Sequence, residues 1–552
     1  MPGDATRHYG IDLGTTYSAV AFIDETGRPT MVRNSLTNDE TTPSVVYFEN
    51  ADNVVVGKTA KDIAQLYPDR VVSLVKREMG QDRQWDYDGT VYTPESISAL
   101  ILRRLVEDTR LYTGQDVSRA VITVPAYFGM LERDATRKAG EIAGLEVLGI
   151  VPEPVAAALE YEVTDGADRT VLVYDLGGGT FDITVIRISV DAIEVLCTDG
   201  DQKLGGADWD ERLLSFLVDE LIAVNPGTDP RDDEQFMQEL AITAEETKRS
   251  LSQVESRSLP LRMAGASALV TVTRQAFAER TRDLLDRTID YTRRALGRLR
   301  EKDPDATIDE VLLVGGSTRM PMVAERLRAE FGWSPRLHDP DLAVAKGAAR
   351  FALGRSVWQW DRDDGAMPTP EQRQKRVDQL ALETGLPADT IAAIAVKKIT
   401  NVLPKAFGVK LIDTSQPGWE DNPDGAMYVE HLVHADDPLP SGPHRLSART
   451  AYASQTSVEV QVYEQAGQVE TSSLSGNKSV DRGAGVISGL PPLPKGSPLD
   501  ITMIVDEEGL LSVRAMEPRT GKGLVIEVRV GVLSQEDVDR ARQAVAGITV
   551  RA

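Results

Sequence analysis

The sequence predicts a two-lobed α/β protein that is followed by an all-β domain. Two observations predict the lobes: short apolar strands alternate with helical segments through residues 1–354, and one strand–turn–strand unit occurs twice among them. A third observation predicts the β domain, because from about residue 406 apolar and polar side chains alternate with a period of two, as at Val458, Val460 and Val462. At 552 residues the chain is also too long for one hydrophobic core.

The composition is that of a globular protein, with 41% hydrophobic and 27% charged residues. The formal net charge of -25 repels phosphates and anionic lipids, so neither nucleic acid nor a membrane is an expected partner. No segment has the roughly 18 apolar residues of a membrane helix and the N-terminus lacks a signal-peptide pattern, so we expect a cytoplasmic protein. The single cysteine, Cys197, excludes an intramolecular disulfide, and its apolar neighbours predict that it is buried.

The repeated unit consists of an apolar strand, an Asp-Leu-Gly turn with threonine, and a second apolar strand. Its first copy spans residues 8–22 and its second copy spans residues 172–186. Solenoid repeats are much shorter than this separation. The repeat therefore favours two similar lobes that close over a shared cleft.

Each turn places small residues where backbone N–H groups can converge on phosphate oxygens. Asp12 precedes Leu-Gly-Thr-Thr in the first turn, and Asp175 precedes Leu-Gly-Gly-Gly-Thr in the second. The two carboxylates provide the anionic oxygens that Mg²⁺ with its water shell prefers. One copy alone is equally well explained as an ordinary tight β-turn. The matched pair favours phosphate binding.

Six motifs occur in order along the chain: Gly10 to Thr16, Val121 to Phe128, Pro152 to Ala158, Val173 to Asp182, Leu204 to Gly206 and Val314 to Pro321. Together they resemble the signature set of the DnaK-type chaperones of the heat shock protein 70 family. The resemblance covers residues 8–354 almost without a gap and implies an actin-like ATPase with a ribonuclease H-like duplicated core, which binds ATP or ADP with Mg²⁺. Residues 442–529 resemble the peptide-binding β-sandwich of the same family.

The resemblance implies roles for individual residues. It also implies slow turnover, because in this family ATP hydrolysis sets the moment of a conformational change. The implied catalytic residues are Lys76, Glu153, Asp175 and Thr180, and Asp12 and Asp175 are the implied Mg²⁺ residues, largely through water. The implied phosphate-binding residues are Gly14, Thr15, Thr16, Tyr17, Gly177, Gly178, Gly179, Gly205 and Gly206. The implied adenosine-binding residues are Glu245, Lys248, Arg249, Ser252, Gly315, Gly316, Ser317, Arg319, Met320 and Asp341.

Helical spacing places four of the adenosine residues on one face. Glu245, Lys248, Arg249 and Ser252 follow the pattern i, i+3, i+4 and i+7. A solvated stripe of ion pairs has the same spacing, and without the other motifs it is the preferred explanation. Both interpretations stay open at this point.

We expect five segments along the chain. They are an ATPase domain (1–354), a helical hairpin (355–398), an interdomain linker (399–405), a β-sandwich (406–533) and a short C-terminal helix stub (534–552). The hairpin has no family counterpart that we can name; Thr369-Pro370 predicts the start of its first helix and Gly385 its end. The stub leaves the sandwich without the family's helical lid.

Other departures concern how the two domains communicate. The linker keeps only Val402 and Leu403 of the family's apolar segment, and no acidic residue follows. The first β loop, residues 413–427, is longer and more polar than the family's loop. Gly149 stands where an arginine is expected beside the Glu153 motif, which weakens the case for a J-domain partner.

These patterns lead to two hypotheses on function. The first is an ATP-dependent chaperone that couples hydrolysis to the binding of extended, unfolded polypeptide, with a nucleotide exchange factor as a further partner. The second is an ATP-bound scaffold that recruits one dedicated protein client. Similarity to the family points to Ala451, Val458 and Val460 as the lining of an apolar peptide groove, and core packing explains the two valines equally well. We expect a monomer.

Overall fold

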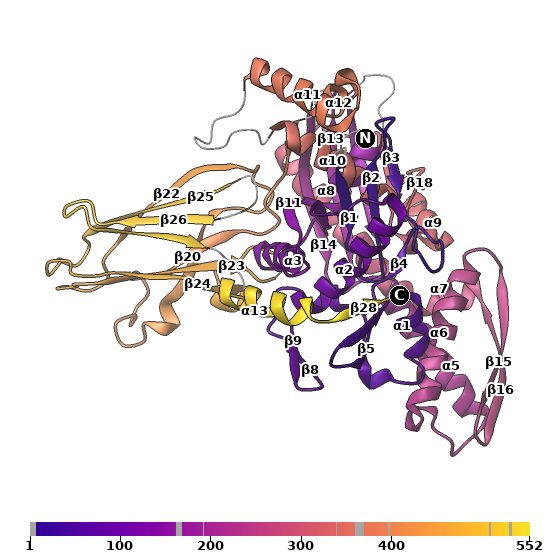
Figure 1. Cartoon of the computed structure of the whole chain (residues 1–552). Helices are drawn as coiled ribbons and strands as arrows, with labels where there is room; N and C mark the ends of the chain where they lie inside the picture. Colours follow the sequence, from indigo (N-terminus) through magenta and orange to yellow (C-terminus); the bar gives the residue numbers. More distant parts are fainter. Residues whose placement is uncertain are drawn as a thin grey trace. The chain divides into compact units, whose positions relative to one another are not determined.

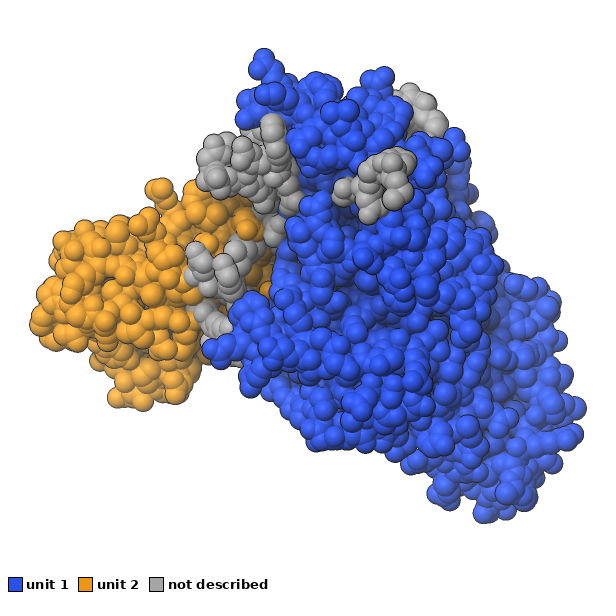
Figure 2. All heavy atoms as spheres, viewed as in Figure 1, with its two compact units in different colours: residues 1–128, 135–398, 533–552 blue, residues 129–134, 399–532 orange. Residues whose placement is uncertain are grey.

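The computed structural model describes residues 7–161, 168–190, 192–337, 339–358, 369–395, 398–467, 469–506, 509, 511–528 and 533–552. The chain forms two compact units (Figure 2). Unit 1 comprises residues 1–128, 135–398 and 533–552, and unit 2 comprises residues 129–134 and 399–532. After residue 398, within β19 (Lys398–Thr400), the chain leaves unit 1 and forms most of unit 2. It re-enters unit 1 at residue 533.

The first large sheet of unit 1 has the strand order β11-β10-β1-β2-β3 (Figure 1). β1 is parallel to β10 and antiparallel to β2; β10 is parallel to β11, and β2 is antiparallel to β3. β4 (Thr42–Pro43) also pairs with β2. The other strands are β1 (Tyr9–Asp12), β2 (Tyr17–Ile23), β3 (Pro29–Met31), β10 (Arg119–Val124) and β11 (Glu146–Pro152).

The second large sheet repeats this topology. Its order in unit 1 is β18-β17-β12-β13-β14, where β12 is parallel to β17 and antiparallel to β13, β17 is parallel to β18, and β13 is antiparallel to β14. β12 thus corresponds to β1, which places Asp12 and Asp175 at equivalent positions near the strand ends. The strands are β12 (Arg169–Leu176), β13 (Phe181–Ile188), β14 (Ala192–Asp201), β17 (Glu310–Val314) and β18 (Arg336–Leu337).

Helices cover both sheets, and some of them begin or end at residues with clear capping chemistry. In α2 (Pro94–Thr113), for example, Thr93 accepts a hydrogen bond from the N–H of Ser96, and Gly114 ends the helix in the left-handed region. The others are α1 (Lys58–Ile63), α3 (Met130–Ile142, of which residues 135–142 belong to unit 1), α4 (Glu153–Glu160), α5 (Gly206–Val224), α6 (Glu234–Leu251), α7 (Arg274–Arg280), α8 (Arg282–Lys302), α9 (Pro321–Phe331) and α10 (Ala343–Trp358).

Unit 1 contains smaller elements as well. They are the hairpins β8 (Trp85–Tyr87) with β9 (Thr90–Tyr92) and β15 (Ser256–Met263) with β16 (Ala266–Thr273), and the 3₁₀ turns η1 (Pro68–Arg70), η2 (Val75–Glu78), η3 (Pro230–Asp232) and η4 (Gly316–Arg319). The turn η2 matters for the site because it carries a buried lysine.

The helical hairpin packs onto unit 1. α11 (Pro370–Thr384) begins at the capping residue Thr369 and ends at Gly385, which confirms both predicted boundaries, and α12 (Ala388–Ala395) follows. Figure 1 shows α11 and α12 near α10. Val377, Leu380, Leu386, Ile391 and Ala395 share one core with α10, β2 and β3. From the sequence we expected residues 355–398 to be a segment separate from the ATPase domain. The described part of this segment instead belongs to unit 1.

The C-terminal residues also belong to unit 1. α13 (Gln535–Ala546) begins at Ser534 with Asp537 as its capping partner. β28 (Thr549–Arg551) pairs in parallel with β6 (Asn53–Val56) in a sheet of order β28-β6-β5-β7, with β5 (Val46–Asn50) and β7 (Val71–Val72). The segment expected as a separate stub is therefore part of the fold of unit 1.

Unit 2 consists of two four-stranded antiparallel sheets, β21-β20-β23-β24 and β22-β25-β26-β27, whose inner side chains form one core. Leu403, expected in the linker, exchanges backbone hydrogen bonds with Asp436 and Asp437 and is completely buried, so it belongs to the fold of unit 2. The strands are β20 (Phe407–Ile412), β21 (Met427–Val433), β22 (Ser441–Arg449), β23 (Val458–Gln465), β24 (Asn477–Ile487), β25 (Pro498–Val505), β26 (Leu511–Met516) and β27 (Gly523–Val528).

Two chain-wide expectations can be compared with these elements. Cys197 lies in β14 and is completely buried, as predicted. Among the described residues, the helices are too short or too polar to cross a membrane.

Candidate functional site

The two Asp-Leu-Gly turns face each other in unit 1. A Cβ at Gly178 would lie 2.1 Å from the Oγ1 atom of Thr16, and a Cβ at Gly179 would lie 2.1 Å from the Cγ2 atom of Thr15. Both distances are far below van der Waals contact, so the approach of the two turns excludes any side chain here. The two copies of the repeat therefore form opposite walls of one site.

The start of α5 completes the second wall. The N–H of Gly206 donates to the carbonyl of Gly177 at 2.9 Å, and a Cβ at Gly205 would lie 2.5 Å from the backbone of Gly179. Because a helix N-terminus carries partial positive charge, its position beside this turn favours a bound anion. Arg77, which the sequence analysis did not select, donates from Nε to the Gly179 carbonyl at 2.8 Å and from Nη2 to Asp208 at 2.5 Å.

The pKa values of the two aspartates, Asp12 and Asp175, are raised above their ordinary values. Burial, reinforced by Glu153, raises the pKa of Asp12 to about 7, and Thr123 donates a hydrogen bond to Asp12 at 2.9 Å. Burial, together with Glu153 and Asp182, also raises the pKa of Asp175 well above its ordinary value. Several carboxyl groups thus share a small volume, where a divalent cation would favour their ionised forms.

The donor atoms around this position are those of a hard cation site. Carboxylate oxygens fit Mg²⁺, and Asp12 and Asp175 are the residues that would hold it. Among the described residues, no three His, Cys, Asp or Glu side chains converge closely enough to enclose a metal ion by themselves. Mg²⁺ usually keeps several water ligands and binds together with phosphate groups of a substrate.

Lys76 supplies the positive charge of the site. It lies in η2 with only 4% of its side chain exposed, and its Nζ atom contacts Oε1 of Glu153, the first residue of α4, at 2.5 Å. The ammonium also lies 5.9 Å from the ring centroid of Phe128. Thr180 accepts a hydrogen bond from the N–H of Gly177 through its carbonyl, at the end of the second turn. The four predicted catalytic residues therefore come from η2, α4 and the second turn.

Part of the predicted adenosine set is tied to the second turn. Lys248 of α6 donates to the carbonyl of Gly206 at 2.8 Å and contacts Asp210 at 2.7 Å. Ser317 of η4 donates to the carbonyl of Gly177 at 2.9 Å. Gly315 has a φ of 81°, and a Cβ there would lie 2.5 Å from an oxygen of Asp175. Among the remaining members, Arg319 forms an ion pair with Asp341, and Asp341 lies next to Gly316. Met320 is buried, and Ser252 is the residue at which α6 ends.

Glu245 and Arg249 of α6 contact Tyr17, whose strand β2 belongs to the other sheet. The Tyr17 hydroxyl accepts a hydrogen bond from Arg249 at 2.7 Å and donates to Glu245 at 3.5 Å. Lys61 of α1 contacts Glu245 at 2.5 Å and Tyr17 at 3.2 Å. This face of α6 therefore takes part in a contact between the two lobes of unit 1.

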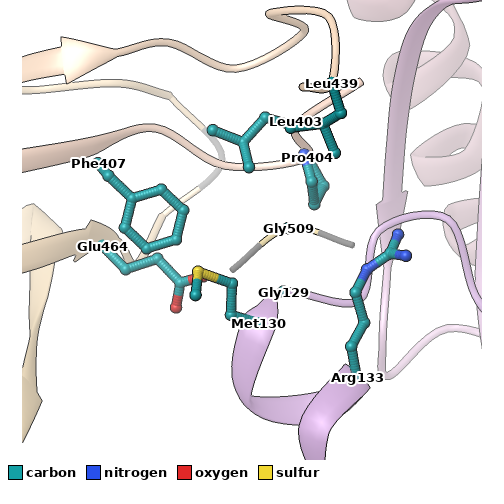
Figure 3. A pocket seen from close by; sticks show the side chains of 9 residues that line it. All are labelled: Gly129, Met130, Arg133, Leu403, Pro404, Phe407, Leu439, Glu464 and Gly509. Atoms are coloured by element: carbon teal, nitrogen blue, oxygen red, sulfur yellow. The ribbon is translucent and has the colours of Figure 1, made fainter. Parts of the chain in front are cut away.

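The predicted groove residues of unit 2 differ in their burial. Val460 is only 3% exposed and lies in the sandwich core, Val458 is partly buried against that core, and Ala451 is half-buried. Core packing thus explains Val460. A small pocket in unit 2 contains none of the three (Figure 3); its lining residues are Gly129, Met130, Arg133, Leu403, Pro404, Phe407, Leu439, Glu464 and Gly509.

The duplicated sheets, the paired turns and the buried lysine define a two-lobed α/β protein with a candidate nucleotide cleft, joined to a β-sandwich. A protein-family model described as "Hsp70 protein" matches residues 8–86, 83–354 and 424–548. These matches cover most of the chain, so this protein belongs to the Hsp70 family. Members of the family are generally chaperones with actin-like ATPase lobes and a β substrate-binding domain. The matches do not include residues 355–423, where the helical hairpin and most of the first β loop lie.

Proposed function

We propose that this protein is an ATP-dependent chaperone in which unit 1 slowly hydrolyses ATP to ADP and phosphate, and unit 2 binds extended, unfolded polypeptide. The observation that carries the proposal is the meeting of the two turns beside the buried Lys76–Glu153 pair and the aspartates Asp12 and Asp175. Phosphoryl transfer requires positioning and neutralisation of charge more than covalent help from the protein. A cleft with these groups meets that requirement.

Each group of the cleft has a distinct role in this proposal. Bound Mg²⁺ would supply neutralising charge at the phosphates, and Asp12 and Asp175 would hold it, largely through water. The partial positive charge at the start of α5 attracts phosphate, and N–H groups of the two turns donate hydrogen bonds to phosphate oxygens. Lys76 places its ammonium near the transferred phosphoryl group, while Glu153 orients that ammonium and accepts a hydrogen bond from the attacking water.

The first experiment measures single-turnover ATP hydrolysis and ATP affinity for the wild type and for Lys76→Ala. Loss of the ammonium removes charge neutralisation from the transition state, so hydrolysis should fall by roughly 100-fold or more while ATP still binds. Lys375→Ala is a matched control because Lys375 lies on the exposed side of α11. Wild-type hydrolysis in Lys76→Ala would remove this residue from the mechanism.

The second candidate function is an ATP-bound scaffold that recruits one dedicated protein. Burial of Val460 in the sandwich core favours it, because one residue assigned to the peptide groove does not face a ligand. Peptide anisotropy after ATP addition separates the two functions. Release of bound peptide on ATP addition, with hydrolysis stimulated by peptide, supports the chaperone; hydrolysis without either effect supports the scaffold.

A further inference from the structure

The last twenty residues of the chain are integrated into unit 1 through their backbone. The N–H of Thr549 donates to the carbonyl of Asp52 at 2.8 Å, and β28 continues beside β6 with Val550 opposite Val54. Arg542 donates to the carbonyl of Glu141 at 2.9 Å. The segment is therefore held at both its helix and its strand.

Side-chain burial fixes the same segment. Leu533, Val538, Val545 and Ile548 are each at most 9% exposed and belong to the core that contains α2 and the first large sheet. Burial of four such side chains makes a strong attachment, because each removes apolar surface from water. An attachment of this strength holds β28 beside β6 in the native state.

β6 is directly connected to the contact between the two lobes. Gly57 follows β6 and α1 begins at residue 58, with the N–H of Lys61 bonded to the carbonyl of Gly57 at 3.0 Å. The side chains of Val55 and Ala60 share a small buried cluster, so β6 and α1 also pack on each other. Lys61 is the next residue, and its ammonium contacts Glu245 of α6.

We propose that β28 is a positioning strand for nucleotide retention: by pairing with β6, it holds α1 where Lys61 contacts Glu245 and keeps the two lobes closed. The proposal rests on the proposed nucleotide cleft and adds a role for the C-terminus of the same chain. The strand acts through Lys61 and contacts no nucleotide itself. Its loss should therefore speed dissociation of nucleotide without removing any group that binds phosphate.

The test measures dissociation of a fluorescent ADP analogue from the full-length protein by stopped flow. One variant lacks residues 549–552, and a second carries Thr549→Pro, which removes the N–H that donates to Asp52. Thr549→Ala is the matched control, since it keeps that N–H and the Thr549 side chain is exposed. The deletion and Thr549→Pro should raise the dissociation rate by roughly fivefold, the scale of a partly buried ion pair, and Thr549→Ala should leave it unchanged.

A double-mutant cycle with Lys61→Met tests whether β28 affects nucleotide dissociation through Lys61. If β28 acts through Lys61, deletion of residues 549–552 adds nothing to the dissociation rate of Lys61→Met. Full multiplication of the two effects, or an unchanged rate in the deletion variant, would overturn the proposal while leaving the nucleotide site intact. Absence of nucleotide binding by the wild type would instead overturn the proposed function.

Hydrogen exchange of the wild type covers the case in which the variants do not fold. Amide groups of α1 and β28 should open together in the nucleotide-free protein, and ADP should protect both. Exchange of α1 while β28 stays protected would refute the coupling.

Discussion

The pH dependence of the stability of unit 1 should be governed in part by His8, next to β1. His8 is 3% exposed, and its Nε2 atom lies 3.0 Å from the hydroxyl of Ser356. Burial, together with the positive charges of Arg119 and Arg376, lowers the pKa of His8 from 6.5 to about 4, although Glu383 opposes the change. The histidine is therefore neutral in the folded protein at neutral pH.

The direction and size of the pH effect on stability follow from the difference between the pKa values of His8 in the unfolded and folded protein. The unfolded chain takes up a proton on His8 below pH 6.5, whereas the folded protein does so only near pH 4. Stability is thus complete above pH 6.5 and decreases as the pH falls towards 4. At about 1.4 kcal/mol per pH unit, the loss from His8 amounts to about 2 kcal/mol at pH 5. Replacement by glutamine keeps a polar group near Ser356 and cannot take up the proton.

The assay compares wild type and His8→Gln by urea unfolding at pH 7.5 and pH 5. Trp419 is the single tryptophan of unit 2, so a Trp419→Phe background makes tryptophan fluorescence report on unit 1 alone. Protonation of Asp12 and Asp175 affects both proteins equally and cancels in the comparison. Between the two pH values, the wild type should lose about 2 kcal/mol more than His8→Gln. Equal losses in the two proteins would refute this account of His8.

Two further predictions concern packing in unit 1. Gly178→Ala introduces a Cβ that would lie 2.1 Å from Thr16, so ATP affinity measured by calorimetry should fall at least tenfold; Gly297→Ala, where the space is open, should leave affinity unchanged. Leu380→Ala removes a completely buried side chain between the hairpin and the sheet and should cost about 2–5 kcal/mol in the urea assay of unit 1. Leu382→Ala, at an 88% exposed position of the same helix, should change stability little, and equal effects of the two leucine variants would contradict the packing of the hairpin.

Local sequence signals predicted the features whose chemistry is local. The Asp-Leu-Gly turns recur because each must bring backbone close to an anion, and that requirement is visible in the glycines and threonines themselves. Capping residues such as Thr369 and Ser534 likewise indicate where their helices begin, because each side chain accepts a hydrogen bond from a backbone N–H only a few residues away. The starts of these two helices and the two-lobed topology could therefore be predicted from the sequence.

Contacts between distant segments carry no such signal. Lys61 and Arg77 read as ordinary surface residues because their partners, Glu245 and the Gly179 carbonyl, lie far along the chain. The same reason hides the destination of residues 533–552, whose short strand becomes stable only by pairing with β6. A parallel pair between residue 54 and residue 550 closes nearly the whole chain into one loop, at an entropic cost that rises only slowly with loop length. The burial of Leu533, Val538, Val545 and Ile548 is what offsets that cost, so the sequence feature that indicates the return is the apolar face of the last helix and not the strand itself.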